Sequence, residues 1–172
     1  SSFIIKMIAD KETHKLLGLQ VAGPGEVDKM ADIAVVGISA GLKAEDFIMM
    51  DFAYAPPFST AIHPFATACG VLCNKLSGRL ESFTPAEYMP APTLTGFDWL
   101  DMTKPETAEG KFKKDEKLLL VCSRGKRAYL TQNKLRALGY TNTRVLEGGA
   151  TVNVIKRALP SGGKLPAAEI KR

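Results

Sequence analysis

A cysteine at the end of a short apolar run is the residue best placed to do chemistry. Leu118–Val121 lead directly into Cys122. The loop that follows is small, polar and basic, and it consists of Ser123, Arg124, Gly125, Lys126 and Arg127. A run that is apolar on both faces is typical of a buried parallel strand, and open α/β sheets bind ligands at the carboxyl ends of such strands. Backbone N–H groups of the loop, the N-terminus of the next helix and the basic side chains would lower the pKa of the thiol and hold it as a thiolate.

The spacing between Cys122 and Arg127 favours sulfur chemistry over phosphate chemistry. A tyrosine-phosphatase-like loop needs one more residue between its cysteine and its arginine to enclose a phosphate. Here Ala128 occupies the position of that arginine. The smaller loop predicts a nucleophile that accepts a sulfur atom. The structural alternative is an inert cysteine that ends a buried strand.

The elements that must position this loop belong to the second half of the chain. Strand and helix patterns alternate there, which predicts a small α/β domain with a parallel sheet over residues 93–160. The expected elements are strand 96–102, strand 118–122, helix 128–138, strand 143–146 and helix 151–159. Residues 161–172 are rich in Gly, Pro and Lys and are predicted to form a flexible tail.

The first half of the chain predicts a separate α+β domain over residues 1–78. The expected elements are a hairpin of strands 3–9 and 15–21, helices 26–40 and 44–49, and a helix that begins at Pro64. Residues 79–92 hold Pro85, Pro90 and Pro92 and show little periodicity, so they are predicted to be a linker.

Composition restricts the class of protein. The chain has 172 residues, 45% of them hydrophobic and 24% charged, as is ordinary for a soluble globular protein. No apolar run approaches the roughly 18–20 residues of a membrane span, so no membrane partner is expected. The net charge of +5 comes without a nucleic-acid motif, so no nucleic-acid partner is expected either. Three cysteines without framework spacing favour a reducing, cytoplasmic setting. Because Ser1 stands inside a strand pattern, we expect the chain to be part of a longer polypeptide.

Two further features have a structural explanation. His63 precedes Pro64 and is predicted to lie at a helix N-cap rather than to act as an acid or base. Cys69 and Cys73 share one helical face with Leu72 and are predicted to be core residues. No other Cys or His pair completes a ligand set with them, so no metal site is expected.

Several short motifs follow one another in the first domain. They are Ile8–Thr13, Leu17–Gln20, Gly23–Gly25, Val27–Lys29, Ala40–Leu42 and, above all, Ala53–Ser59. With them, residues 3–78 resemble the dimerisation domain of the flavin-dependent pyridine nucleotide-disulfide oxidoreductases, in the branch of CoA-disulfide reductases and NADH oxidases. The resemblance implies a homodimer in which the hydroxyl of Tyr54 reaches the disulfide site of the partner subunit. There it would donate a hydrogen bond or a proton to a leaving thiolate.

Residues 93–159 resemble a rhodanese domain, with Cys122–Arg127 as its active loop and Leu146–Gly149 as its late turn. The resemblance implies that Cys122 accepts a sulfane sulfur and that the loop amides and Arg127 stabilise the negative charge. The domain is shortened, because no Gly-His-Ile-Pro-Gly-Ala-like segment precedes Leu118. Asp101-Met102-Thr103 stands where Asp-Val-Arg is usual.

Both resemblances together imply the C-terminal fragment of a flavin-dependent NAD(P)H:disulfide/CoA-persulfide oxidoreductase. FAD and NAD(P)H would bind to the preceding domains of the same polypeptide, because the chain contains no Gly-x-Gly-x-x-Gly motif. The fragment itself is expected to bind neither cofactor, with CoA as a further candidate ligand, and to be at most a sulfurtransferase.

Two alternatives stay open. One is a purely structural dimerisation module with a vestigial, inactive rhodanese-like domain. The other is a CoA-docking module that uses the basic residues Lys111, Lys113, Lys114 and Lys126.

Overall fold

The structure is a computed structural model that describes residues 3–88, 98–99 and 112–153. The chain divides into two compact units, Ser1–Arg79 and Leu80–Arg172, and each is described by itself. The predicted domain and linker limits stay a prediction. Within the described ranges, no helix is long and apolar enough to cross a lipid bilayer.

The first unit begins with the predicted hairpin. Strands β1 (Ile4–Ala9) and β2 (Leu16–Ala22) pair antiparallel, and Lys6 lies opposite Gln20. Side chains of β1 alternate between more and less exposed, as the period of a strand requires. The turn between the strands is closed by Asp10, whose carboxylate accepts the backbone N–H groups of Glu12 at 3.1 Å and Thr13 at 2.6 Å.

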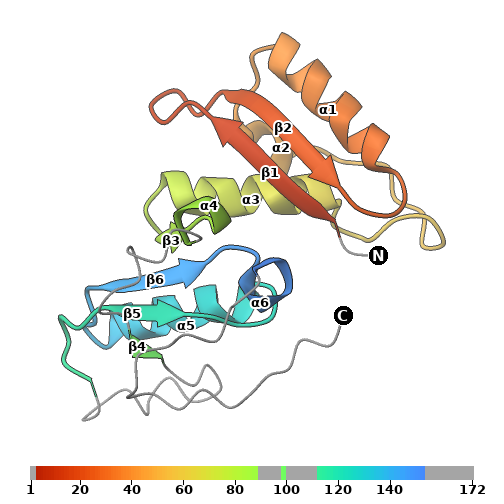
Figure 1. Ribbon diagram of the computed structural model, residues 1–172. Helices are drawn as coiled ribbons and strands as arrows, with labels where there is room; N and C mark the ends of the chain where they lie inside the picture. The colour runs from red at the N-terminus through yellow and green to blue at the C-terminus, as the bar shows by residue number, and fades with distance from the viewer. Residues whose placement is uncertain (1–2, 89–97, 100–111, 154–172) are drawn as a thin grey trace. The chain divides into compact units, whose positions relative to one another are not determined.

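Three helices complete this unit, and all three were expected. They are α1 (Val27–Ser39), α2 (Ala44–Ile48) and α3 (Pro64–Leu76). Helix α1 packs along β2 and α3 contacts β1 (Figure 1). Gly41 follows the end of α1 with a φ of +67°, the left-handed conformation that suits a glycine after a helix.

The core of the first unit lies between the hairpin and the helices. Its buried residues are Leu16, Met30, Ala34, Phe47, Phe65 and Cys69. The rings of Phe47 and Phe65 meet edge to face, with centroids 5.0 Å apart. Helix α1 approaches Phe47 closely at Gly37, where a Cβ would lie 2.1 Å from the ring carbon Cζ.

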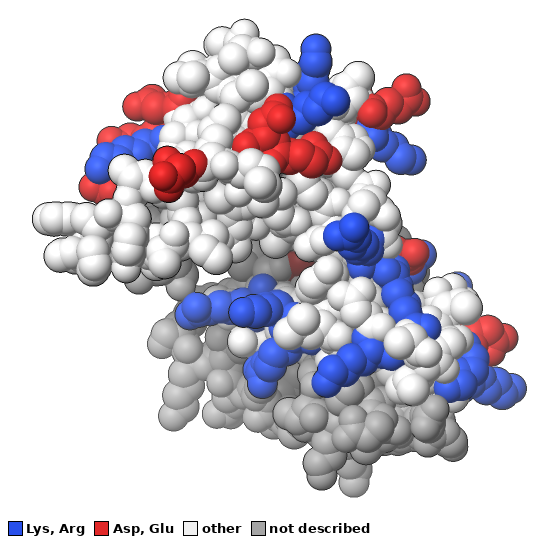
Figure 2. Space-filling view, turned by 180° about the vertical axis from the view of Figure 1, so that it is seen from behind, with Lys and Arg blue, Asp and Glu red and all other residues white. Residues whose placement is uncertain are grey.

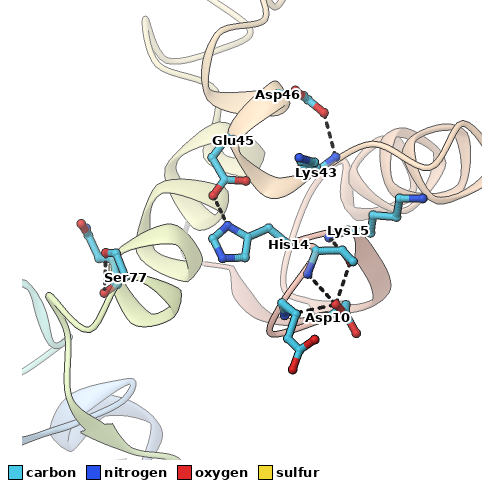
Figure 3. A network of polar contacts seen from close by, with 10 residues as sticks. Asp10, His14, Lys15, Lys43, Glu45, Asp46 and Ser77 are labelled. Atoms are coloured by element: carbon cyan, nitrogen blue, oxygen red, sulfur yellow. Dashed lines mark hydrogen bonds and ion pairs between the residues drawn. The ribbon is translucent and has the colours of Figure 1, made fainter.

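A polar network ties the hairpin to α2 (Figure 3). The imidazole Nδ1 of His14 contacts the carboxylate of Glu45 across the gap between the two elements. His14 has a φ of +61°, and its carbonyl accepts the N–H of Ala44 at 3.0 Å. Lys43 donates its backbone N–H to the Asp46 carboxylate at 2.8 Å, which caps the start of α2.

The second unit holds a parallel sheet. Among the described residues, its strands lie in the order β3 (Ser82–Phe83), β6 (Thr143–Leu146), β5 (Leu118–Leu120) and β4 (Asp98–Trp99). Helix α5 (Lys126–Ala137) packs against β5 and β6 (Figure 1). Every residue of β5 is buried, as the sequence pattern predicts for a central parallel strand. The α+β unit followed by a small parallel α/β unit confirms the predicted fold class.

The edge strand β3 and the helix α4 (Pro85–Tyr88) lie where the sequence predicts no regular element. Two residues carry no periodic signal, and β3 exists because it pairs with β6 far along the chain, Ser82 opposite Val145. The side chain of Gln132 in α5 links Glu81, the residue before β3, to Thr143 of β6. Its fully buried amide donates to the carbonyls of Glu81 at 2.8 Å and Thr143 at 2.9 Å and accepts the N–H of Glu81 at 3.1 Å.

Candidate functional site

The loop around Cys122 connects β5 to α5 and differs slightly from its prediction. Strand β5 ends at Leu120, opposite Val145, so Cys122 lies two residues beyond the ladder. Helix α5 begins at Lys126 rather than at residue 128, because the carbonyl of Gly125 accepts the N–H of Tyr129 at 2.9 Å. Gly125 has a φ of +99°, which lets the chain turn sharply into the helix.

Backbone N–H groups surround the sulfur of Cys122. The N–H of Gly125 lies 3.0 Å from the sulfur atom Sγ. Burial alone would raise the pKa of the Cys122 thiol, since only 9% of the residue is exposed. Hydrogen bonds from the backbone N–H groups of Ala128, Arg124, Gly125 and Arg127 outweigh this effect and hold the pKa below its ordinary value. The site therefore favours a thiolate at the carboxyl edge of the sheet.

The side chains of the loop contribute differently from its backbone. Ser123, Arg124, Lys126 and Arg127 have exposed side chains. Arg127 contributes its backbone N–H group to the sulfur. The predicted role of Arg127 in stabilising a sulfur anion stays a prediction. Lys and Arg side chains predominate on the visible face of the second unit (Figure 2). The loop thus presents a ring of amides to the sulfur and positive charge to solvent.

Helix α6 (Gly149–Val152) contacts the backbone of the loop, and this contact is not predicted from the sequence. Its Ala150 N–H donates to the carbonyl of Cys122 at 2.9 Å, and its Thr151 N–H donates to the carbonyl of Ser123 at 3.0 Å. The helix begins two residues earlier than predicted. The signal in the sequence is the Glu-Gly-Gly turn after β6, because two adjacent glycines allow a close backbone approach.

Tyr54 belongs to the first unit and lies in an open groove of about 500 Å³. Its side chain is 56% exposed. The segment is held by a turn in which Ser59 donates its N–H to the carbonyl of Ala55 at 3.0 Å, while the Ser59 hydroxyl accepts the N–H of Ala55 at 3.1 Å. The tyrosine is thus presented at the surface by a fixed, proline-containing turn, in a different unit from Cys122.

His63 is the N-cap of α3, as the sequence predicts. Its Nδ1 accepts the N–H of Phe65 at 3.2 Å, and its ring stacks on Phe52 at 4.6 Å between centroids. Burial lowers the pKa of the imidazole and favours the neutral form that accepts this hydrogen bond.

The other two cysteines contrast with Cys122. Cys69 is fully buried in the core, and burial raises the pKa of its thiol to about 12. Cys73 is half-buried, and burial together with Glu45 raises its pKa to about 11. In the part of the chain that the structure describes, no group of three or more His, Cys, Asp or Glu residues is arranged to hold a metal ion.

Two family models match the chain. Residues 1–66 match the pyridine nucleotide-disulphide oxidoreductase dimerisation domain, and residues 88–152 match the rhodanese-like domain. The chain therefore carries a dimerisation domain of the pyridine nucleotide-disulphide oxidoreductases followed by a rhodanese-like domain.

Two similar proteins come from Pyrococcus species. The chain is 38% identical over 68 residues to the NAD(P)H sulfur oxidoreductase (CoA-dependent) of Pyrococcus furiosus. It is 37% identical over 68 residues to the NAD(P)H coenzyme A polysulfide/persulfide reductase of Pyrococcus horikoshii. Each match covers 40% of this chain and 15% of the relative.

Two solved structures share the fold over most of the chain. One is a NAD-dependent persulfide reductase from A. fulgidus, with a TM-score of 0.75 and 25% identity. The other is reduced CoADR-RHD from Bacillus anthracis, with a TM-score of 0.78 and 22% identity. Each comparison covers 87% of this chain and 30% of the solved chain, so the present sequence spans less than a third of either.

Proposed function

We propose that this chain is the C-terminal part of a flavin-dependent NAD(P)H:disulfide or CoA-persulfide oxidoreductase, in which it supplies a homodimerisation surface and a sulfur-carrier cysteine. The observation that carries the second role is the ring of N–H groups around the sulfur of Cys122. The match of residues 1–66 to the dimerisation-domain model supports the first role.

The proposed step is a sulfur transfer to Cys122. The thiolate attacks the outer sulfur of a donor such as thiosulfate, and a new sulfur–sulfur bond forms on the cysteine. The bond between the two sulfur atoms of the donor breaks, and sulfite leaves with the electron pair. The terminal sulfur of the resulting persulfide carries the negative charge, and the N–H groups that surround Sγ of Cys122 would stabilise it.

The electron-transfer chemistry belongs to domains that would precede this chain. In the whole enzyme FAD and NAD(P)H would supply electrons for cleaving a disulfide or persulfide. Because the 172 residues contain no Gly-x-Gly-x-x-Gly motif, we assign no part of dinucleotide binding to them. Tyr54 would act in the same enzyme as a hydrogen-bond donor at the disulfide site of the partner subunit.

The homodimerisation role is supported by exposed apolar side chains of the first unit. Large examples on α1 and on the segment after α2 are Val35, Val36, Ile38, Met49, Phe58 and Ile62. A subunit interface buries exposed apolar side chains of this kind.

Turnover with thiosulfate and cyanide tests the sulfur-carrier role. The persulfide of Cys122 should pass its outer sulfur to cyanide, which releases thiocyanate and regenerates the thiolate. Cys122→Ser should abolish this activity, whereas the matched Cys73→Ser variant should keep it. Absence of thiocyanate above the uncatalysed rate, with polysulfide as well as with thiosulfate, would favour the alternative of a purely structural dimerisation module.

A further inference from the structure

The loop around Cys122 has two sides with opposite hydrogen-bonding character. The N–H groups of Arg124, Gly125, Arg127 and Ala128 face the sulfur. The carbonyls of Cys122 and Ser123 face α6. The carbonyl of Ser123 and the N–H of Arg124 belong to the same peptide unit, and in a trans peptide these two groups point in opposite directions. When Thr151 donates its N–H to the Ser123 carbonyl at 3.0 Å, it therefore also fixes the direction of the Arg124 N–H toward the sulfur.

Helix α6 reaches these carbonyls only because residue 149 is a glycine. A Cβ built on Gly149 would lie 2.1 Å from the carbonyl oxygen of Cys122 and 2.8 Å from the nitrogen of Arg124. Both contacts are with backbone atoms, which cannot rotate away as a side chain would. Gly149 also has a φ of +55°, a conformation that other residues adopt with strain.

A buried asparagine holds α6 in this place. Asn153 is 3% exposed, and its amide Nδ2 donates to the carbonyls of Glu147 at 2.7 Å and Gly149 at 2.8 Å. Glu147 is in turn tied to β3, since its carboxylate accepts the hydroxyl of Ser82 at 2.6 Å. The turn that supports the loop is thus fastened to the edge of the sheet.

We propose that Gly149 and Asn153 are positioning residues for Cys122, which act by holding the carbonyl side of the loop so that its N–H side converges on the sulfur. This inference rests on the proposed function, in which Cys122 reacts as a thiolate. Neither residue touches the sulfur donor. Their effect passes through the peptide units of residues 122–124.

The test compares Gly149→Ala with Gly139→Ala. Gly139 also has a positive φ, +88°, but a Cβ there meets nothing within 4 Å. The two variants therefore share backbone strain and differ in the clash with the loop. The measurement is the rate of alkylation of Cys122 by iodoacetamide as a function of pH, in protein shown to be folded by circular dichroism.

Gly149→Ala should move the midpoint of this profile to higher pH, so that alkylation near neutral pH slows about tenfold for each pKa unit. Gly139→Ala should keep the wild-type midpoint even where its melting temperature falls. Equal midpoints in both variants would overturn the inference, because a merely structural role changes stability and leaves the titration of the folded state in place.

Asn153→Leu gives an independent test should Gly149→Ala fail to fold. Leucine keeps the approximate volume and lacks the donor, so the midpoint should again rise. Asn142→Leu, which likewise removes an amide donor to a backbone carbonyl, that of Asp115 at 2.7 Å, is the matched control and should show no change. A wild-type profile with an ordinary thiol midpoint would defeat the proposed function itself. A low wild-type midpoint that Asn153→Leu leaves in place would defeat the positioning role alone.

Discussion

The three cysteines of the chain lie in two different environments, one at Cys122 and the other at Cys69 and Cys73. Backbone N–H groups outweigh burial at Cys122, whereas at Cys69 and Cys73 burial acts without such donors. The same side chain is thus favoured as a thiolate at Cys122 and as a protonated thiol at the other two positions.

This contrast predicts the order of alkylation in the wild-type protein. Near neutral pH a thiol with a lowered pKa is deprotonated to a greater extent, so iodoacetamide should modify Cys122 first. Cys73 and Cys69, with pKa values near 11 and 12, should react only in strong alkali or after unfolding. Peptide mass mapping along a pH series measures the order, and modification of Cys73 before Cys122 would contradict it.

At the scale of elements, one glycine decides how closely α1 approaches α2. Gly37→Ala would place a methyl group 2.1 Å from the ring carbon Cζ of Phe47, and overpacking of this kind typically costs about 1–3 kcal/mol of the free energy of unfolding. Gly70 in α3 has nothing within 4 Å of its Cβ position, so Gly70→Ala should instead stabilise by up to about 1 kcal/mol. Urea unfolding measures both changes. Equal effects in the two variants would show that the Gly37 contact is not close.

The His14–Glu45 pair should make the attachment of the hairpin depend on pH. Burial raises the pKa of Glu45, but the hydrogen bond with His14, the backbone N–H of Glu45 and the positive charges of His14 and Lys43 together outweigh burial, so the folded-state pKa lies below the ordinary 4.5. A group with a lowered pKa stabilises the fold above its unfolded pKa, and this contribution disappears as pH falls through the folded value.

His14→Asn removes the imidazole and tolerates the positive φ. Because the pair is partly exposed and screened, it should lower the free energy of unfolding near pH 7 by only about 0.2–1 kcal/mol. The difference from wild type should vanish in acid, where Glu45 is protonated. Denaturant titrations at both pH values check this, and a difference that persists in acid would rule out an electrostatic origin.

Most of the described helices and strands can be predicted from the sequence, because short local patterns determine them. Examples are the alternation in residues 3–9, the apolar face of α1 and the His63-Pro64 start of α3. The sequence also predicts that Cys122 lies in a loop between a strand and a helix, as the structure has it. Two features are not predicted. One is β3, whose two residues form a strand only by pairing with β6. The other is the pair of hydrogen bonds from α6 to the loop. Both depend on partners far away in the sequence, which periodicity does not encode.

On the scale of the whole molecule, the first unit should associate through its exposed apolar side chains. Phe58 is 84% exposed and is the clearest anchor. If it lies in the interface, Phe58→Glu should weaken dimerisation about tenfold or more, as expected for an aromatic hot spot. Leu130→Glu, an exposed apolar position on α5 of the other unit, is the matched control. Light scattering across a concentration series measures the dissociation constants, and equal constants for both variants would place the interface elsewhere.

The central claim is that Cys122 carries sulfane sulfur, and the mass of the protein tests it most directly. The 172-residue chain is exposed to thiosulfate or polysulfide, freed of donor and weighed intact, then mapped by peptides. We expect a gain of one sulfur atom on the peptide that contains Cys122, which cyanide removes and which Cys122→Ser lacks. No added sulfur with either donor, or a gain that survives Cys122→Ser, would contradict it.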